Sequence, residues 1–139
     1  MMQNARRILV DNGYTCVVMK DDFCFTSKQR GVKPLLELID SSNDCEGAAA
    51  ADKVVGKAAA FLYLLLGVKA VYADVISEYA VAVLQKRGVL VDYTTLVPMI
   101  KSRDGSGFCP MEQATLAVED EKNALEVIRE TLSRLTKNN

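Results

Sequence analysis

The stretch GAAAADKVVGKAAAFLYLLLGVKAVYA, residues 47–73, decides the fold that the sequence predicts. Its alanine- and leucine-rich part favours a helix from about Ala48 to Leu66, because these two residue types have the highest helix propensities. Gly67 follows the last apolar turn, and glycine is the usual residue at a helix end. The next segment, VKAVYA, is typical of a strand. A helix that leads at once into a strand indicates an α/β domain.

Outward from this stretch, helices and strands alternate. The segment at residues 15–27, TCVVMKDDFCFTS, predicts a hairpin with a two-residue turn. Such a turn places Cys16 opposite Ser27 and sends Cys16 and Cys24 to opposite faces. The other predicted elements are a helix over residues 3–12, a helix over about 32–41, a helix over 77–86, strand material over 89–97 and helical turns from 110 to 135. The apolar spacing of the last helix indicates docking on the domain's own sheet rather than a coiled coil. The sequence therefore predicts one α/β domain over residues 1–139, with three α-β-α layers and a mixed central sheet.

The composition excludes several functions. The chain has 139 residues, with 17 basic and 18 acidic side chains and a formal charge of -1, so it offers no general attraction for nucleic acid. It contains no histidine, which removes the Ser-His-Asp and Cys-His catalytic units and the H-E-x-x-H zinc helix. Most familiar hydrolase mechanisms are excluded with them.

The apolar runs and the cysteines bear on where the protein works. The longest apolar run, residues 58–68, is shorter than the roughly 20 residues that a membrane-spanning helix needs. The N-terminus lacks the long apolar segment of a secretory signal. The four cysteines form no C-x-x-C pair and are expected to be reduced thiols. We therefore expect a cytoplasmic protein that does not bind a membrane.

Charged residues inside the predicted central helix mark the first candidate site. Lys53 and Lys57 would repel each other on one helix face, and Gly56 weakens a helix by about 1 kcal/mol relative to alanine. A ligand would compensate for these costs. Asp52 and Lys53 lie near the predicted helix start, where N–H groups favour an anion, and Gly56 permits close approach. In the alternative interpretation, Lys57 extends its charge into solvent, Asp52 complements the helix dipole and Gly56 is a packing contact.

The segment SRDGSGFCPMEQ, residues 102–113, supplies the second candidate site. Pro110 suits the first position of a helix, which makes Cys109 the N-cap and puts Glu112 at the capping-box position. A helix N-terminus and a nearby Arg103 would favour the thiolate of Cys109, whereas Glu112 would oppose it. The alternative is a small buried cysteine after a loop.

Two further groups of residues are candidates for ligand binding. Gly105 and Gly107 of the same loop could present N–H groups to a phosphate. Asp74, Ser77 and Glu78 follow the predicted strand, and ligands of parallel sheets gather outside the carboxyl ends of strands. The alternative for Ser77 is an ordinary N-cap of the next helix.

The motifs D-K-V-x-G-K-A-A, residues 52–59, and C-P-M-E, residues 109–112, together resemble the domain-of-unknown-function 1893 (DUF1893) family, over essentially the whole chain. The resemblance implies a fold similar to that of the cytidine deaminases. Those enzymes hold zinc with H-x-E or C-x-E at the start of one core helix and P-C-x-x-C at the start of the next. The corresponding positions here, near Asp52 and near Ser77, contain neither a thiol nor an imidazole. We therefore expect no zinc and no other cofactor.

These observations lead to one main functional hypothesis and two alternatives. The main hypothesis is a metal-free, cytidine deaminase-like domain that binds a small anionic or nucleotide-like ligand. The pocket would be lined by Asp52, Lys53, Lys57 and residues 74–78, with the Cys109 loop as its rim. The first alternative is an enzyme that uses Cys109 as nucleophile or redox thiol, with Lys53 or Lys57 polarising the substrate. The second is a structural or assembly protein, in which the last helix or an exposed sheet edge forms a homo-oligomer.

Overall fold

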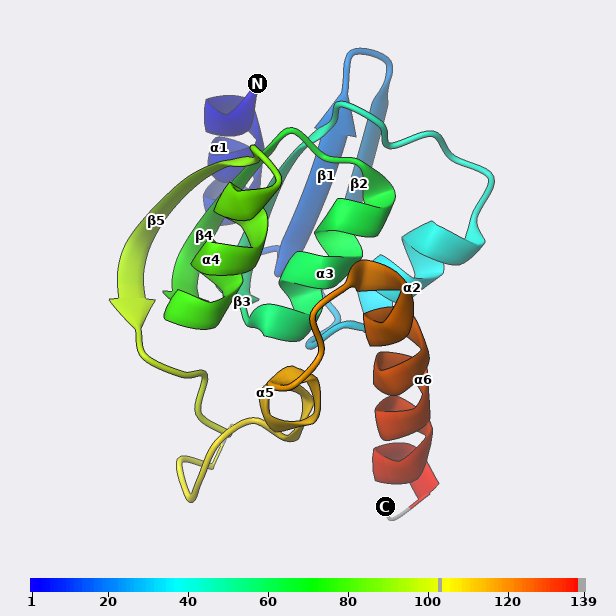
Figure 1. Ribbon diagram of the computed structural model, residues 1–139. Coiled ribbons are helices and arrows are strands. Elements are labelled where there is room, and N and C mark those ends of the chain that lie inside the picture. The colour runs from blue at the N-terminus through cyan, green and yellow to red at the C-terminus, as the bar shows by residue number, and fades with distance from the viewer. Residues whose placement is uncertain (103, 138–139) are drawn as a thin grey trace.

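The computed structural model describes residues 1–102 and 104–137. Five strands form one mixed sheet in the order β2-β1-β3-β4-β5, with helices on both faces (Figure 1). The strands are β1 (Cys16–Lys20), β2 (Phe23–Ser27), β3 (Ala49–Val55), β4 (Ala70–Ser77) and β5 (Leu90–Val97). The helices are α1 (Met2–Asn12), α2 (Lys33–Asp40), α3 (Lys57–Leu66), α4 (Glu78–Lys86), α5 (Pro110–Thr115) and α6 (Glu121–Lys137). β1 is antiparallel to β2 and β3, whereas β3, β4 and β5 are parallel, so the predicted mixed α/β class is confirmed.

The predicted helix over residues 48–66 is confirmed only in its second half, where α3 ends at Leu66 with Gly67 as its C-cap, and is wrong in its first half, which forms β3. β3 is the central strand, and its alanines at 49–51 are buried between helices on both faces. A strand that is covered on both faces has a continuous apolar pattern, which cannot be told from that of a buried helix. The tertiary position of β3 therefore overrides the helix propensity of alanine. Lys53 and Lys57 consequently lie on different elements and do not share a helix face.

The predictions on either side of this segment are confirmed. In the hairpin, Cys16 pairs with Ser27 across the two-residue turn. Cys16 is buried and Cys24 is exposed, and both are free thiols. The predicted helix over residues 77–86 is α4, and the predicted strands before and after it are β4 and β5.

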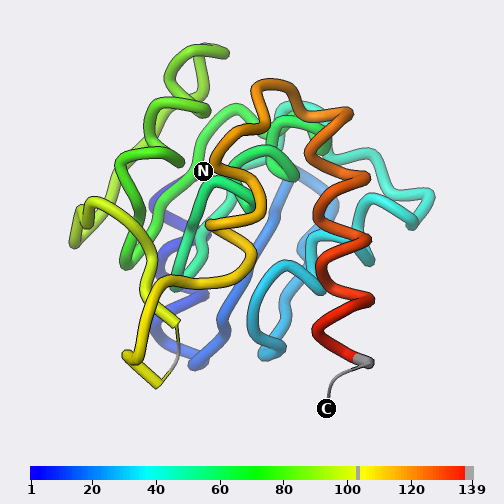
Figure 2. Tube along the Cα trace, turned by 60° about the horizontal axis from the view of Figure 1, so that its bottom comes forward, coloured from blue at the N-terminus to red at the C-terminus, as the bar shows by residue number. Residues whose placement is uncertain are grey.

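The helices are divided unequally between the two faces of the sheet. α1 covers one face of the sheet (Figures 1 and 2). There Leu9 belongs to a small core with Tyr72 of β4. α2, α3 and α4 lie on the other face, over the larger core. α6 packs outside α3, and Ile128 of its apolar stripe is fully buried. This helix therefore docks on its own domain, but against α3 and α5 and not on the sheet as predicted.

The parallel strands determine where helix starts meet. β3 leads into α3 and β4 leads into α4, so both helices begin at the same end of the sheet. α5 lies across this end and packs against α3 and α6 (Figure 1). Within residues 1–102 and 104–137, no helix is both long and apolar enough to cross a membrane.

Candidate functional site

The carboxylate of Glu112 lies between the starts of α3 and α4. Glu112 belongs to the first turn of α5 and is 1% exposed. Its Oε1 accepts hydrogen bonds from the backbone N–H of Lys57 at 2.6 Å and from the hydroxyl of Ser77 at 3.1 Å. Its Oε2 accepts one from the backbone N–H of Ile100 at 2.7 Å. One side chain thus joins three segments that are far apart in the sequence.

The local sequence at the start of α3 explains why this carboxylate is held so closely. The N-cap of α3 is Gly56, which has no side-chain oxygen to accept from the first N–H groups of the helix. A Cβ at Gly56 would lie 3.2 Å from Oε1 of Glu112 and 3.3 Å from Cγ1 of Ile100. The absence of a side chain therefore makes room for Glu112, which caps α3 from another element. The close approach predicted at Gly56 is confirmed, and the group that approaches is the carboxylate of Glu112 from the same chain.

Lys57 holds α5 through its side chain as well as through its backbone. Its Nζ donates to the carbonyl oxygen of Leu116, just after α5, at 2.7 Å. The ammonium group also lies 5.7 Å from the centre of the Phe61 ring. Burial lowers the pKa of Lys57, against the opposing influence of Glu119 and Glu112. Lys57 therefore contacts both ends of α5.

A second buried carboxylate, Asp52, lies between the sheet and α3. Asp52 is 9% exposed, and its Oδ2 accepts a hydrogen bond from the hydroxyl of Tyr63 at 2.7 Å. Its Oδ1 accepts a longer bond from the backbone N–H of Val54 at 3.3 Å. The thiol of Cys16 lies 3.5 Å from the same tyrosine oxygen. These groups form a buried polar chain from β1 through α3 to β3.

Burial dominates the ionisation of this chain. Desolvation raises the pKa of Asp52 to about 7, although the donors from Tyr63, Val54 and Lys53 counteract the rise. Desolvation also raises the pKa of Cys16 and of Tyr63, and in both cases the charge of Asp52 adds to the effect. Asp52 is therefore poised to change protonation near neutral pH, but inside the protein.

The predicted pairing of Asp52 and Lys53 at a helix start is wrong, because α3 begins only at Lys57. Lys53 is exposed at the end of β3, while Asp52 faces inward to Tyr63. Asp74 of the neighbouring strand β4 is level with Lys53 in the register of the two strands, and it is also exposed. The side chains of Asp52 and Lys53 therefore do not line one pocket.

At the start of α4, too, one predicted site residue is buried and the next is exposed: Ser77 is buried and Glu78 is exposed. Ser77 is the N-cap, as the alternative interpretation predicted, and its hydroxyl accepts from the N–H of Ala80 at 3.2 Å. The same hydroxyl donates to Glu112, which brings Ser77 into the cluster around this carboxylate. Glu78 is exposed and turned away from it.

The capping-box role predicted for Glu112 is wrong. Cys109 is the N-cap of α5, but its backbone N–H donates to the carbonyl of Ile100 at 2.9 Å and not to Glu112. The thiol of Cys109 is partly buried and makes no hydrogen bond with any residue in the described part of the chain. Within residues 1–102 and 104–137, no hydrogen bond joins Cys109 to Lys53 or Lys57.

The loop before α5 closes on its own side chains. Oδ1 of Asp104 accepts from the backbone N–H of Ser106 at 3.0 Å and from the hydroxyl of Ser102 at 2.7 Å. The N–H of Gly107 donates to the hydroxyl of Ser102, and that of Gly105 to its carbonyl. The nest predicted at the two glycines is therefore occupied by acceptors of the loop itself. Arg103 lies outside the described residues.

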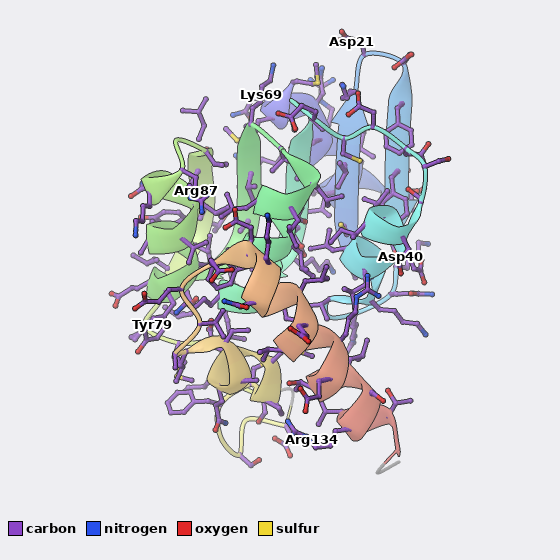
Figure 3. All side chains as sticks on the ribbon, turned by 45° about the vertical axis from the view of Figure 1, so that its right-hand side comes forward. Asp21, Asp40, Lys69, Tyr79, Arg87 and Arg134 are labelled. Carbon is purple, nitrogen blue, oxygen red and sulfur yellow. The ribbon has the colours of Figure 1, made fainter. Side chains whose placement is uncertain are left out.

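A cavity lies elsewhere, between α2 and α6. It is an open groove of about 460 Å³, lined by Leu36, Arg129, Leu132, Ser133 and Thr136. None of these residues belongs to the predicted site. At the other end of α4 from Ser77, Arg87, labelled in Figure 3, joins α4 to α6 through guanidinium bonds of 2.9 and 2.8 Å to Glu121.

The sequence reasoning missed the chain of Tyr63 and Cys16, and it assigned Glu112 to the wrong partner. One signal could have indicated the partner. Gly56 is a poor source of side-chain capping, so a helix that starts there needs an acceptor from elsewhere. No comparable signal marked Tyr63, because it lies within an apolar run and has the pattern of an ordinary core residue of a helix.

Comparisons with known proteins agree on one family. The sequence profile of the family described as TM1506, domain of unknown function (DUF1893), matches residues 4–132. The crystal structure of a DUF1893 family protein (TM1506) from Thermotoga maritima, at 2.70 Å resolution, has a similar fold with a TM-score of 0.83. The two chains are 31% identical over a match that covers 95% of this chain and 88% of that chain. None of the curated proteins matches.

Proposed function

Because this chain belongs to the DUF1893 family, whose name assigns no activity, we propose a function from the geometry of its site. The protein is a metal-free, cytidine deaminase-like domain that binds a small anionic or nucleotide-like ligand at the starts of α3 and α4. The observation that carries this proposal is the position of Glu112. A single carboxylate, buried between two helix starts, marks a place that requires negative charge.

The deaminase-like assignment is supported by the topology. β1 is antiparallel to the parallel strands β3, β4 and β5, and α3 and α4 cross the same face and begin at the same end of the sheet. Cytidine deaminases hold their catalytic metal at the starts of two successive helices. The carboxylate of Glu112 occupies the comparable place in this chain.

A zinc ion does not fit this place. The groups that point into it are the backbone N–H of Lys57 and the hydroxyl of Ser77, which both donate to Glu112 and so favour an anion. A tetrahedral zinc site needs three or four thiolate, imidazole or carboxylate ligands. In the described residues, no group of three or more His, Cys, Asp or Glu side chains is arranged to hold a metal ion.

The ligand binds by taking the place of Glu112. α5 has six residues, lies outside the sheet and packs mainly against α3 and α6, so it can be displaced without opening the core of strands. Its displacement would expose the Lys57 N–H and the Ser77 hydroxyl, and would free the Lys57 ammonium from the carbonyl of Leu116. These groups together suit a phosphate.

The competition with Glu112 selects the ligand. A carboxylate on the same chain has a high effective concentration, so an external group with the same single charge would not replace it. A phosphate monoester carries about -2 charge and three acceptor oxygens near neutral pH. We therefore expect nucleoside monophosphates and inorganic phosphate to bind better than carboxylates.

Calorimetric titration with nucleoside monophosphates and inorganic phosphate tests the proposal. We expect weak binding to the unmodified protein and at least about tenfold tighter binding to Glu112→Gln, because the variant keeps the shape of the side chain but removes its competing charge. Lys57→Ala should weaken binding in both backgrounds. Circular dichroism verifies that each variant is folded.

Lys69→Ala is the matched control. Lys69 is an exposed lysine at the opposite end of the sheet from α5, as its label in Figure 3 shows. Its removal should leave affinity unchanged. The proposal is overturned when neither the unmodified protein nor Glu112→Gln binds any of these compounds, or when Lys57→Ala and Lys69→Ala bind them equally.

A further inference from the structure

The outer side of β5 is an unpaired sheet edge. Figure 1 shows β5 at the rim of the described chain, with β4 as its strand neighbour. On one face α4 covers β5, while α1 on the other face packs across β1, β3 and β4. The backbone N–H and C=O groups along the outer side of β5 are therefore available to another strand.

β5 lacks the features that usually protect such an edge. Its eight residues contain no lysine, no proline and a single charge, that of Asp92. Leu90 is 67% exposed, and Tyr93 and Leu96 are exposed as well. The other edge strand, β2, has only five residues. An exposed apolar side chain on a long free edge is a feature of strands that pair with another chain.

The sequence of β5, LVDYTTLV, has the same polarity when it is read from either end. Residues 90–91 and 96–97 are apolar, and the four residues between them are polar or aromatic. When two copies align antiparallel about a two-fold axis at Tyr93, Leu90 of each strand faces Leu96 of the other, so the apolar end of each strand meets the apolar end of the other. This match requires no segment other than β5 itself, so a second copy is the partner that the edge fits.

The charge on β5 agrees with the same alignment. Asp92 lies one residue from the axis at Tyr93, so in the antiparallel pair it faces Thr94 of the second copy and not its own equivalent. A threonine hydroxyl can donate to the carboxylate, and no two like charges oppose each other. We propose that two copies of this protein associate by antiparallel pairing of their β5 strands, which joins their sheets into one.

Sedimentation of the full chain over a range of concentrations tests the pairing. We expect a reversible monomer–dimer equilibrium that Leu90→Lys shifts toward monomer by at least about tenfold in the dissociation constant. Adding Leu96→Glu to Leu90→Lys should restore the dimer, because the new lysine of each copy then faces the new glutamate of the other. Both leucines are exposed in the monomer, so the substitutions should not unfold it.

Val10→Lys is the matched control, since Val10 is 66% exposed but lies on α1. It should leave the equilibrium unchanged. A purely monomeric protein at every concentration overturns the proposal. A dimer that responds equally to Val10→Lys and Leu90→Lys, or one that the double variant does not restore, also overturns it.

Cross-linking locates the axis independently. In a Cys24→Ser background, Tyr93→Cys should form a disulfide-linked dimer with oxidised glutathione, because the residue on the axis faces its own equivalent and opposite residues have Cα atoms about 4.5–5.5 Å apart. A cysteine in place of the exposed Lys86, beyond the paired segment, should remain reduced. Equal cross-linking at both positions would contradict the alignment.

Discussion

Glu112 and Asp52 are both buried carboxylates, but the protein surrounds them differently. Glu112 comes from a short peripheral helix and accepts three hydrogen bonds, from Lys57, Ser77 and Ile100. Asp52 comes from the central strand and accepts one short bond from Tyr63 and one long bond from its own strand. Glu112 connects distant segments of the protein, whereas Asp52 completes a local row of buried polar groups.

The difference shows that donors, and not burial alone, decide what a buried carboxylate does. Two of the donors to Glu112 lie at helix starts, where the macrodipole adds to the attraction for a negative charge. Asp52 has no helix start and no cation among its donors, and desolvation raises its pKa to about 7. Glu112 is therefore expected to stabilise the fold by joining two helix starts, and Asp52 to do so as a neutral acid below a pH of about 7.

The largest effect should follow from removing the connecting carboxylate. Glu112→Ala leaves the buried N–H groups of Lys57 and Ile100 without an acceptor, so we expect the free energy of unfolding to fall by about 3–5 kcal/mol. Glu112→Gln retains one acceptor oxygen and should cost only about 1–2 kcal/mol. Urea denaturation monitored by circular dichroism measures both values.

Glu126→Ala on the exposed side of α6 is the control for this comparison. It should change the free energy of unfolding by less than about 0.5 kcal/mol. A Glu112→Ala variant as stable as Glu126→Ala would show that the cluster does not connect α3, α4 and α5 in solution.

The pH dependence of stability should reveal the different state of Asp52. Its pKa is about 7 in the folded protein and about 3.8 for an ordinary aspartate, as in the unfolded chain, so between these values the folded state binds the proton more strongly than the unfolded state. Stability therefore falls as pH rises from about 5 to about 7, with a slope of at most about 1.4 kcal/mol per pH unit. The expected loss over this range is about 2 kcal/mol.

Asp52→Asn isolates the contribution of this group. The variant cannot titrate at this position. The difference in the free energy of unfolding between the variant and the unmodified protein should therefore change between about pH 5 and about pH 7. Tyr63→Phe removes the donor that lowers the pKa of Asp52, and should extend the falling limb to higher pH. A pH profile that is identical in Asp52→Asn and the unmodified protein would place Asp52 in contact with water. Four exposed aspartates have a lowered pKa, so they change the stability only at more acidic pH, where stability falls as the pH falls. They are Asp40, Asp44, Asp104 and Asp120.

The outer elements of the fold could be predicted from the sequence more accurately than the central strand β3. The hairpin register could be predicted because a two-residue turn and alternating side chains fix which residues face each other. The N-cap at Ser77 is a local signal of the same kind. β3 could not be predicted from its alanines, since burial on both faces removes the alternation that distinguishes a strand.

The candidate site was less predictable because its contacts are long-range. Lys57 and Glu112 are 55 residues apart, and Ser77 and Glu112 are 35 residues apart. The sequence reasoning identified all three as candidates, but local rules assigned Glu112 to its own helix. Asp52 was also identified, but its orientation toward Tyr63 depends on the strand that replaced the predicted helix.

The smallest effect should come from narrowing the space that Glu112 occupies. Gly56 has φ -95°, which any residue can adopt, so Gly56→Ala introduces no backbone strain. Its new Cβ would lie 3.2 Å from Oε1 of Glu112, and we expect a loss of about 1 kcal/mol in the free energy of unfolding. Gly107→Ala is the control, because a Cβ there meets nothing within 4 Å. Since the strain at Gly56 arises largely from contact with Glu112, the same substitution in a Glu112→Ala background should cost less than half as much. Additive losses in this double-mutant cycle would mean that Glu112 and Gly56 stabilise the protein independently, and that the carboxylate is not held against the start of α3.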